Sequence, residues 1–241
     1  MKKYSLTYHQ FSSNSILISW PNSIDNFIFS DLSSYKLILE NSIKSIIEVR
    51  AAYCSLLVVY DHEMDNFYRY IIELKSFYSL KKTDSSISNY KWKIPVCYDQ
   101  CFGSDLEILS KTKSLSIDEI IDLHSLKSYK VYFMGFLPGF LYLGGLDKKL
   151  HIPRKDNPKL NILKGSVAIG GQQTGVYPSN SPGGWYVIGN SPINFFDINK
   201  SKICFAKPGD ELSFYTITKE EHENISKNLS SFKLESEVIY G

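Results

Sequence analysis

GFLPGFLYLGG (residues 135–145), GSVAIGGQQTGVYP (165–178) and SPGGWYVIG (181–189) are the glycine-rich strings that decide the fold of this chain. Short apolar runs between Gly and Pro residues are typical of a protein with many short strands. The expected strands of this region are YKVYFMG (129–135), SVAIGG (166–171), TGVY (174–177), GWYVIG (184–189), INFFDI (193–198) and ELSFYT (211–216). Such a series predicts a closed β-barrel, because closure leaves no exposed strand edge.

The string 135–145 is itself predicted to be irregular, because its glycines and proline exclude a regular helix or a central strand. Two interpretations of it stay open. It forms either an aromatic wall whose glycines let a ligand approach the backbone, or a corner of the barrel.

A polar segment, LKKTDSSISNYK (80–91), separates this region from the first part of the chain. It predicts a domain boundary, with one domain at 1–85 and a second at 86–241. The expected elements of the first part are strands at 4–11 and 15–20, a helix at 25–40, two strands within 46–60 and a helix at 65–78. They predict a small α/β sandwich with one sheet and helices on one face, so the fold class is α+β.

The second domain is predicted to open with a strand, WKIPVCY (92–98), that is followed by helices. Three helix starts carry the capping-box pattern, in which Ser or Thr is followed three residues later by Glu. The expected boxes are Ser104 with Glu107, Ser116 with Glu119, and Thr218 with Glu221.

Composition excludes several classes of protein. The 241 residues are 43% hydrophobic and carry a net charge of +2 with no basic stripe, so no nucleic-acid partner is expected. The opening MKKYSLTYHQFSSNS lacks the apolar stretch of a secretory signal. The most apolar segment, 46–60, contains two charged residues and is shorter than the roughly 20 residues that span a bilayer. We therefore expect a cytoplasmic protein without a membrane contact. Cys97 and Cys101 lack a second pair, so no metal site is expected.

The loops supply the candidate site residues. Arg154 follows a proline, and a guanidinium held in this way is a good ligand for a carboxylate or phosphate. Gln172, Gln173 and Thr174 lie between two glycines, where amide and hydroxyl groups can pair with a lactam or amide. A solvated arginine and a polar hairpin tip are the alternative interpretations.

Aromatic residues of the same loops complete the predicted site. Loops of a small barrel gather at its mouth, so we expect Phe140, Tyr177 and Trp185 to line one cleft with the Gln172–Thr174 turn. Trp185 could equally be a core residue. His124 lies on the expected buried face of a helix, where a histidine is either a core residue or, less often, a catalytic group.

Several familiar signatures are missing from the chain. It contains no GxxxxGK[ST] phosphate loop, no GxSxG elbow and no HExxH zinc helix. If the protein uses ATP, it does so by another arrangement or through a partner.

The chain resembles the family of B-type subunits of 5-oxoprolinase, which is also described as Kip-type kinase inhibitors and as allophanate hydrolase subunit 1. The resemblance runs from about residue 46 to residue 214. The strings that carry it are EVRAAYCSLLVVYD, LSIDEIIDLHSLKSYKVYFMGFLPGF, GFLPGFLYLGGLD, IPR, GSVAIGGQQTGVYP and SPGGWYVIG.

This resemblance implies a cyclophilin-like second domain and a complex with a C-type and an A-type subunit. The complex would open the lactam of 5-oxoproline to L-glutamate and would consume ATP, which binds with Mg²⁺. The chain alone would be inactive. Backbone N–H groups and Arg154 could then stabilise negative charge on the activated carbonyl. Two alternatives stay open: an inhibitor of a sensor histidine kinase, and a carboxyltransferase-like or allophanate-hydrolase-like module that acts on another amide.

Overall fold

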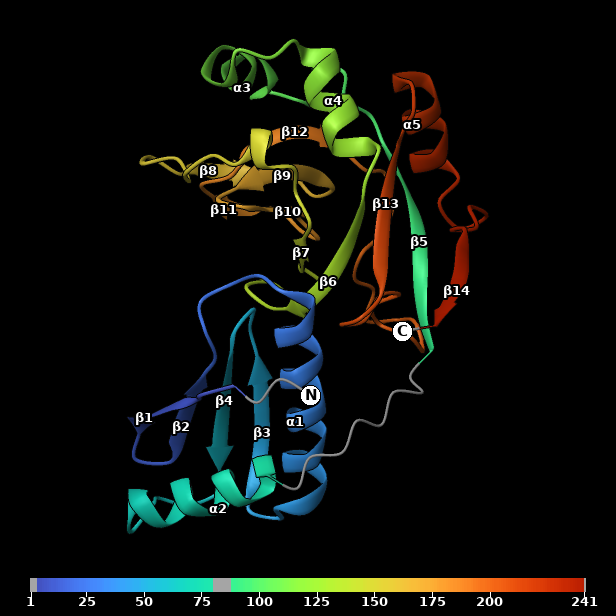
Figure 1. The fold of residues 1–241 in the computed structure, drawn as a ribbon. Helices are drawn as coiled ribbons and strands as arrows, with labels where there is room; N and C mark the ends of the chain where they lie inside the picture. Colours follow the sequence, from blue (N-terminus) through green and yellow to red (C-terminus); the bar gives the residue numbers. More distant parts are fainter. Residues whose placement is uncertain (1–3, 80–87, 241) are drawn as a thin grey trace. The chain divides into compact units, whose positions relative to one another are not determined.

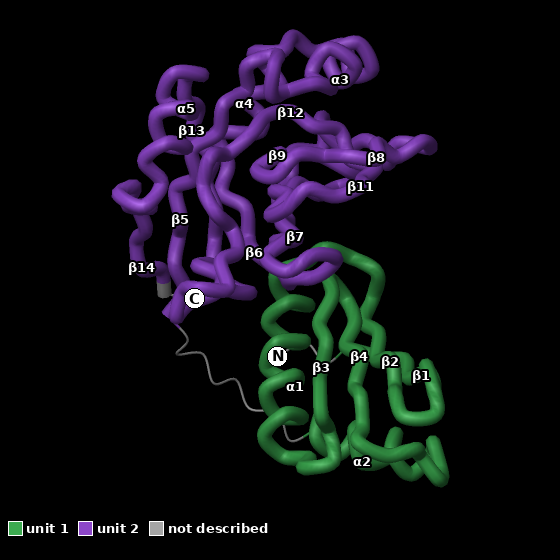
Figure 2. Tube along the Cα trace, turned by 180° about the vertical axis from the view of Figure 1, so that it is seen from behind, with its two compact units in different colours: residues 1–86 green, residues 87–241 purple. Residues whose placement is uncertain are grey.

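A computed structural model describes residues 4–79 and 88–240 of the chain. The chain divides into two compact units, residues 1–86 and residues 87–241 (Figures 1 and 2). The predicted boundary between residues 85 and 86 lies outside the described residues, which resume at residue 88.

The first unit is one antiparallel sheet with two helices. Its strands stand in the order β1-β2-β4-β3. Its elements are β1 (Thr7–Ser12), β2 (Ser15–Ser19), α1 (Asn26–Ser42), β3 (Ile46–Ala51), β4 (Ser55–Tyr60) and α2 (Phe67–Ser79). All six agree with the elements predicted for this part of the chain.

The helices of this unit cover one face of the sheet. Strand residues alternate between two faces, so Ile16, Ile18, Leu56 and Val58 all point to the same side, where they are fully buried. They pack against the apolar stripes of both helices in one hydrophobic cluster. The predicted sandwich is therefore the observed one.

The second unit contains an eight-stranded mixed sheet, ordered β12-β9-β10-β7-β6-β13-β5-β14, in which β13 and β5 are parallel. Its strands are β5 (Ser88–Val96), β6 (Ser128–Met134), β7 (Leu141–Gly144), β9 (Ser166–Gly170), β10 (Gln173–Val176), β12 (Tyr186–Asn190), β13 (Glu211–Thr216) and β14 (Ser236–Tyr240). A separate two-stranded ribbon consists of β8 (Lys159–Ile162) and β11 (Ser181–Gly183). The helices are α3 (Leu106–Lys113), α4 (Ile117–Ser125), the short η1 (Lys148–Leu150) and α5 (Lys219–Lys227).

The predicted closed barrel is not confirmed, since β12 and β14 are the outer strands of the sheet. The sheet nevertheless curves strongly. Cys97, which follows β5, forms a bridge to Asn190 of β12 through two backbone hydrogen bonds of 2.9 Å. This bridge brings the β12 end of the sheet back to the end of β5, over a core that is shared by the strands, α3 and α4.

Three details of the predicted elements are wrong. Residues 141–144 of the supposedly irregular string form an interior strand, β7, between β10 and β6. The run 193–198 lies in a loop and not in a strand. The first capping box is absent: Asp105, not Ser104, precedes α3, and Glu107 instead accepts a hydrogen bond from Gln100.

The two other capping boxes are confirmed at α4 and α5. In each, the cap hydroxyl accepts from the Glu backbone at 3.1 Å and the Glu carboxylate accepts from the cap backbone at 2.7 Å. Among the described helices, none is both long enough and apolar enough to cross a membrane.

Candidate functional site

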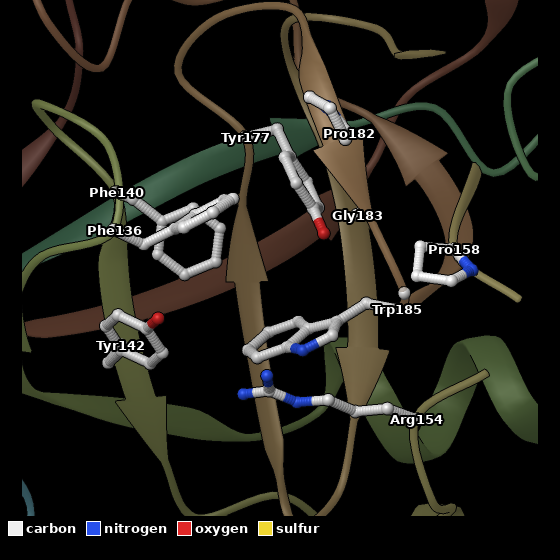
Figure 3. Close-up of a pocket in the computed structure, with 10 residues that line it drawn as sticks. Phe136, Phe140, Tyr142, Arg154, Pro158, Tyr177, Pro182, Gly183 and Trp185 are labelled. Atoms are coloured by element: carbon white, nitrogen blue, oxygen red, sulfur yellow. The ribbon is translucent and has the colours of Figure 1, made fainter. Parts of the chain in front are cut away.

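A cavity of about 260 Å³ opens in the second unit, lined by residues in and next to the strands β7, β11 and β12 and in the loop before β8 (Figure 3). This volume is slightly below the range of about 300–1,000 Å³ that is typical of ligand pockets. Its lining residues come from four separate loops and strand ends: Phe136, Phe140, Tyr142, Arg154, Pro158, Tyr177, Pro182, Gly183, Gly184 and Trp185.

Glycines on neighbouring strands make room for the aromatic wall of this cavity. A Cβ atom at Gly170 would lie 2.4 Å from the Trp185 ring, and one at Gly175 would lie 3.0 Å from the Phe140 ring. Both rings are almost fully buried and contact each other edge to face at 5.5 Å. The glycines of the sequence therefore leave space for the two aromatic rings to lie directly against the outer face of the sheet.

Arg154 supplies the positive charge of the cavity. Its guanidinium lies over the Trp185 ring, 5.7 Å from the ring centroid, and Figure 3 shows the ring between it and Tyr177. In the described part of the chain, no carboxylate lies within ion-pair distance of this guanidinium, and no acidic residue lines the cavity. The site therefore presents an uncompensated cation beside an apolar wall, which suits an anionic ligand.

Two tyrosines add hydroxyl groups to this wall. Burial raises the pKa of Tyr177 to about 12 and also raises the pKa of Tyr142, whereas the nearby charge of Arg154 acts in the opposite direction on both. Both phenols are therefore protonated at neutral pH and can donate or accept a hydrogen bond. The two neutral hydroxyl groups can form hydrogen bonds with an amide without adding a charge to the cavity.

The cavity is built for binding rather than for proton transfer. Its lining residues include no His, Cys, Ser, Asp, Glu or Lys. It can hold a small ligand that combines a carboxylate, an amide and an apolar ring face. In the described ranges, no group of three potential metal ligands stands together.

The structure brings four of the predicted site residues together in this cavity: Arg154, Phe140, Tyr177 and Trp185. It does not place the turn Gln172–Thr174 in the same cavity. Thr174 is completely buried, because its position on β10 points its side chain into the core.

Gln172 lies in the turn between β9 and β10, and Gln173 is the first residue of β10. Gln172 is exposed. Gln173 pairs across the strands with Gly170, the residue beneath Trp185, and its buried Oε1 atom has no hydrogen-bond partner among the described residues. Gln173 thus lies next to the glycine that contacts the Trp185 ring, but it does not line the cavity.

His124 lies in the core and does not reach the cavity. It is fully buried on α4, with Nδ1 2.8 Å from the Tyr98 hydroxyl and Nε2 2.9 Å from Thr174 Oγ1. The Thr174 hydroxyl donates its one hydrogen to the Ala168 carbonyl at 3.1 Å. Nε2 must therefore carry the proton and donate to Thr174, while Nδ1 accepts from Tyr98.

This environment keeps His124 neutral. Burial lowers its pKa to about 3, and its ring stacks on Phe214 at 4.7 Å. A neutral, fully bonded and buried imidazole holds the core together, and the catalytic role predicted for His124 has no geometric support at this cavity.

Sequence reasoning did not single out Phe136 and Tyr142 as lining residues, although both belong to the string 135–145, for which an aromatic wall was one of the two interpretations. Phe136 adopts a left-handed backbone with φ of 67°, is 60% exposed, and contacts Phe140 edge to face at 5.6 Å. A non-glycine residue in this region is strained, and such residues cluster at functional sites. The aromatic density of residues 133–142 was the available signal.

Comparison with known proteins agrees with the pattern of the sequence. Residues 6–206 match the family described as carboxyltransferase domain, subdomain C and D. The chain is 37% identical over 195 residues to the B-type subunit of 5-oxoprolinase from Bacillus subtilis, which covers 76% of this chain and 80% of the relative. It is 44% identical over 122 residues to the protein of the same name from Escherichia coli O157:H7, covering 51% and 56%.

A solved structure has the same fold over both units. The crystal structure of the K. lactis urea amidolyase superposes with a TM-score of 0.86 over 98% of this chain and 16% of that one, at 18% sequence identity. That similarity concerns the fold alone. The extent of the family match and the identity to the Bacillus subtilis protein decide the relationship: the chain belongs to the family of 5-oxoprolinase B-type subunits.

Proposed function

We propose that the chain is the B-type subunit of an ATP-dependent 5-oxoprolinase, and that the cavity around Arg154 binds 5-oxoproline. The observation that carries this proposal is the unpaired guanidinium over Trp185 in a small aromatic cavity. 5-Oxoproline is a five-membered lactam with one carboxylate. The relatives are named as one subunit of a 5-oxoprolinase, and that name indicates a multi-subunit enzyme for this substrate.

Each chemical feature of 5-oxoproline has a counterpart in the cavity. Arg154 would bind the carboxylate, since a guanidinium offers two parallel N–H donors. The hydroxyls of Tyr142 and Tyr177 would pair with the lactam N–H and carbonyl. Trp185 and Phe140 would cover the ring face and exclude water from the carbonyl carbon.

The reaction itself needs groups that this cavity lacks. Resonance with the nitrogen makes a lactam carbonyl a poor electrophile, and phosphorylation of its oxygen by ATP would activate it toward water. The cavity's lining holds one cation and no His, Cys, Asp, Glu or Lys that could act as a general base. We therefore assign to this chain the binding and orientation of 5-oxoproline, and to A-type and C-type subunits the proton transfer and the site for ATP with Mg²⁺.

The residues of this cavity do not fit a nucleotide site. A triphosphate with its metal ion needs several donors and oxygen ligands at one place, whereas the lining offers Arg154 alone. The proposal thus makes the cavity a substrate site and not an ATP site. We also propose that the second unit is a cyclophilin-like domain and that the protein is cytoplasmic.

The test is reconstitution with candidate A-type and C-type subunits. Purified together, the three chains should hydrolyse ATP only when 5-oxoproline is added, and glutamate should form in proportion. A complex that assembles but hydrolyses no ATP in response to 5-oxoproline would contradict the proposal. Proline, which has the carboxylate and ring but no lactam carbonyl, is the control ligand.

A further inference from the structure

The loop that carries Arg154 has little structure of its own. It runs from the bridge between Ile152 and Gly171 to the start of β8 at Lys159. Lys155, the next residue after Arg154, donates its backbone N–H to the Gly184 carbonyl at 2.8 Å. One backbone bond beside an exposed arginine cannot by itself fix where a long side chain lies.

A buried carboxylate supplies the missing restraint. Asp105, at the start of α3, is 1% exposed. Its Oδ1 lies 2.7 Å from Lys155 Nζ and 3.0 Å from Lys159 Nζ, so it holds both lysines of the Arg154 loop. Burial opposes the ionisation of Asp105, but hydrogen bonds from Lys155, the Val187 backbone and Lys159 outweigh it and lower its pKa.

The same carboxylate also holds the strand that follows Trp185. Asp105 Oδ2 accepts from the Val187 backbone at 2.8 Å, and the Asp105 backbone donates to the Val187 carbonyl at 2.9 Å. Asp105 is thus bonded to the loop of the guanidinium and to the strand of the indole. These two parts of the chain are distant in sequence, and they form the cation–aromatic pair of the cavity.

Lys155 has a second contact that holds its side chain against the same strand. Lys155 Nζ also lies over the Tyr186 ring, 5.0 Å from its centroid, so both lysine contacts direct the loop toward β12. A buried carboxylate is costly unless it is paired and hydrogen-bonded. Here every bond that offsets the cost of its burial fixes one side of the cavity.

We propose that Asp105 is a positioning residue that sets the Arg154 guanidinium over Trp185 for carboxylate binding. The proposal rests on the proposed function for its ligand, 5-oxoproline, but not for the geometry it assigns. Without the charge of Asp105, Lys155 and Lys159 are released and Arg154 samples positions away from the indole. The cavity then keeps its cation but loses its preorganisation.

A second buried carboxylate provides the matched control. Asp210 is also fully buried, has an ion pair with Lys207 at 3.3 Å, and accepts from the Tyr90 backbone at 2.9 Å. It accepts from Trp92 Nε1 at 3.1 Å and does not contact the cavity. Replacing either carboxylate by Asn removes one buried charge, but only one of the two changes concerns Arg154.

The experiment reads each tryptophan separately. The chain contains three Trp residues, so 5-fluorotryptophan labelling gives three ¹⁹F resonances, which Trp→Phe variants assign. Asp105→Asn should move the Trp185 resonance in the direction seen for Arg154→Ala, and Asp210→Asn should move the Trp92 resonance and leave that of Trp185 in place. Titration with 5-oxoproline should then show binding about tenfold weaker for Asp105→Asn and unchanged for Asp210→Asn.

The outcomes separate this proposal from the proposed function. An unmoved Trp185 resonance and unchanged affinity in Asp105→Asn would overturn the positioning role. If the wild-type chain does not respond to 5-oxoproline but Asp105→Asn still moves Trp185, the ligand is wrong and the positioning role stands. Should Asp105→Asn fail to fold, Lys155→Met decides in its place, because it keeps the stem over Tyr186 and removes the pair. Lys155→Met should shift the Trp185 resonance in the same direction, and an unshifted Trp185 resonance in this variant would overturn the proposal.

Discussion

At the scale of single residues, the proposed function depends on which charged side chains have no ion-pair partner. Asp105 and Asp210 are buried and satisfied by lysines and backbone donors, whereas Arg154 is exposed above an indole with no carboxylate beside it in the described chain. Paired charges hold the structure, and an unpaired one is available to a ligand. His124 is neutral and also holds the structure, since both of its ring nitrogens are bonded.

Arg154→Ala should weaken 5-oxoproline use without unfolding the chain. Loss of a charge-assisted contact costs about 1.5–3 kcal/mol, which corresponds to a KM roughly 10- to 100-fold higher in the reconstituted complex. Arg154→Lys keeps the charge but not the planar, stacked fork, so we expect an intermediate KM. The melting temperature is the control: a large fall with a normal KM would make Arg154 structural.

Thr174→Val should lower stability rather than impair binding directly. Valine keeps the shape of the side chain but leaves the buried Nε2–H of His124 without an acceptor, which costs about 1–3 kcal/mol. Urea unfolding of the isolated chain measures this loss. The matched control is Thr112→Val, the same change at an exposed helix position, which should alter stability by less than about 0.5 kcal/mol. Equal effects at the two sites would contradict the assigned hydrogen bond.

The stability of the chain should fall as the pH drops below about 6.5. Burial lowers the pKa of His124 to about 3, so between these values the unfolded chain binds a proton that the folded chain does not. Each such histidine lowers the free energy of unfolding by up to about 1.4 kcal/mol per pH unit. Urea unfolding between pH 7 and about 4.5 measures the slope above the range in which most carboxylates titrate.

His222 contributes with the same sign, because burial also lowers its pKa. A His222→Gln variant removes this contribution and should leave the larger part of the slope, which belongs to His124. A flat profile in that variant would show that His124 is protonated in the fold.

At the scale of elements, glycines decide where the strands let aromatic rings lie. In β11, a Cβ atom at Gly183 would lie 2.3 Å from the Tyr177 hydroxyl and 2.7 Å from Ile162. Gly183→Ala should therefore displace Tyr177 and weaken 5-oxoproline binding, as isothermal titration of the purified chain would measure. Gly135→Ala is the control, because the nearest atoms there are 3.8 Å away. If Gly183→Ala bound as tightly as Gly135→Ala, Tyr177 would not contact the ligand.

Local patterns in the sequence predicted most elements, and tertiary pairing explains the failures. Alternation and helical spacing identified all six elements of the first unit. β7 was missed because its Leu-Tyr-Leu-Gly run is flanked by glycines that signal a turn, and only pairing with β6 and β10 makes it a strand. Residues 193–198 are apolar for another reason. Ile193 and Phe195 pack into the hydrophobic core from a loop, so their burial does not depend on a strand.

The candidate site was predicted in part for the same reason. Gly- and Pro-rich loops correctly indicated Phe140, Tyr177 and Trp185 as neighbours, and the structure adds Arg154 to them. They could not indicate which side of β10 Thr174 faces, since that depends on the register with β7 and β9. Asp105 was hidden for a different reason: its lysine partners are distant in sequence, and the apparent capping box pointed to the neighbouring Ser104 instead.

At the scale of the whole molecule, the proposed binding site lacks the groups that the proposed reaction requires. The isolated chain should therefore show no ATP hydrolysis in response to 5-oxoproline, even at saturating concentrations of both. The reason is the lining of the cavity, which contains no His, Cys, Asp, Glu or Lys that could act as a general base. A coupled phosphate-release assay checks this, and steady turnover by the isolated chain would contradict the assignment of chemistry to the other subunits.

The most direct test of the account is the KM for 5-oxoproline in a complex reconstituted with A-type and C-type subunits and either wild-type chain or Arg154→Ala. We predict 5-oxoproline-dependent ATP hydrolysis by the wild-type complex, and a KM about 10- to 100-fold higher for the variant at equal complex assembly. An Arg154→Ala complex with unchanged KM, or an assembled wild-type complex that ignores 5-oxoproline, would contradict the account.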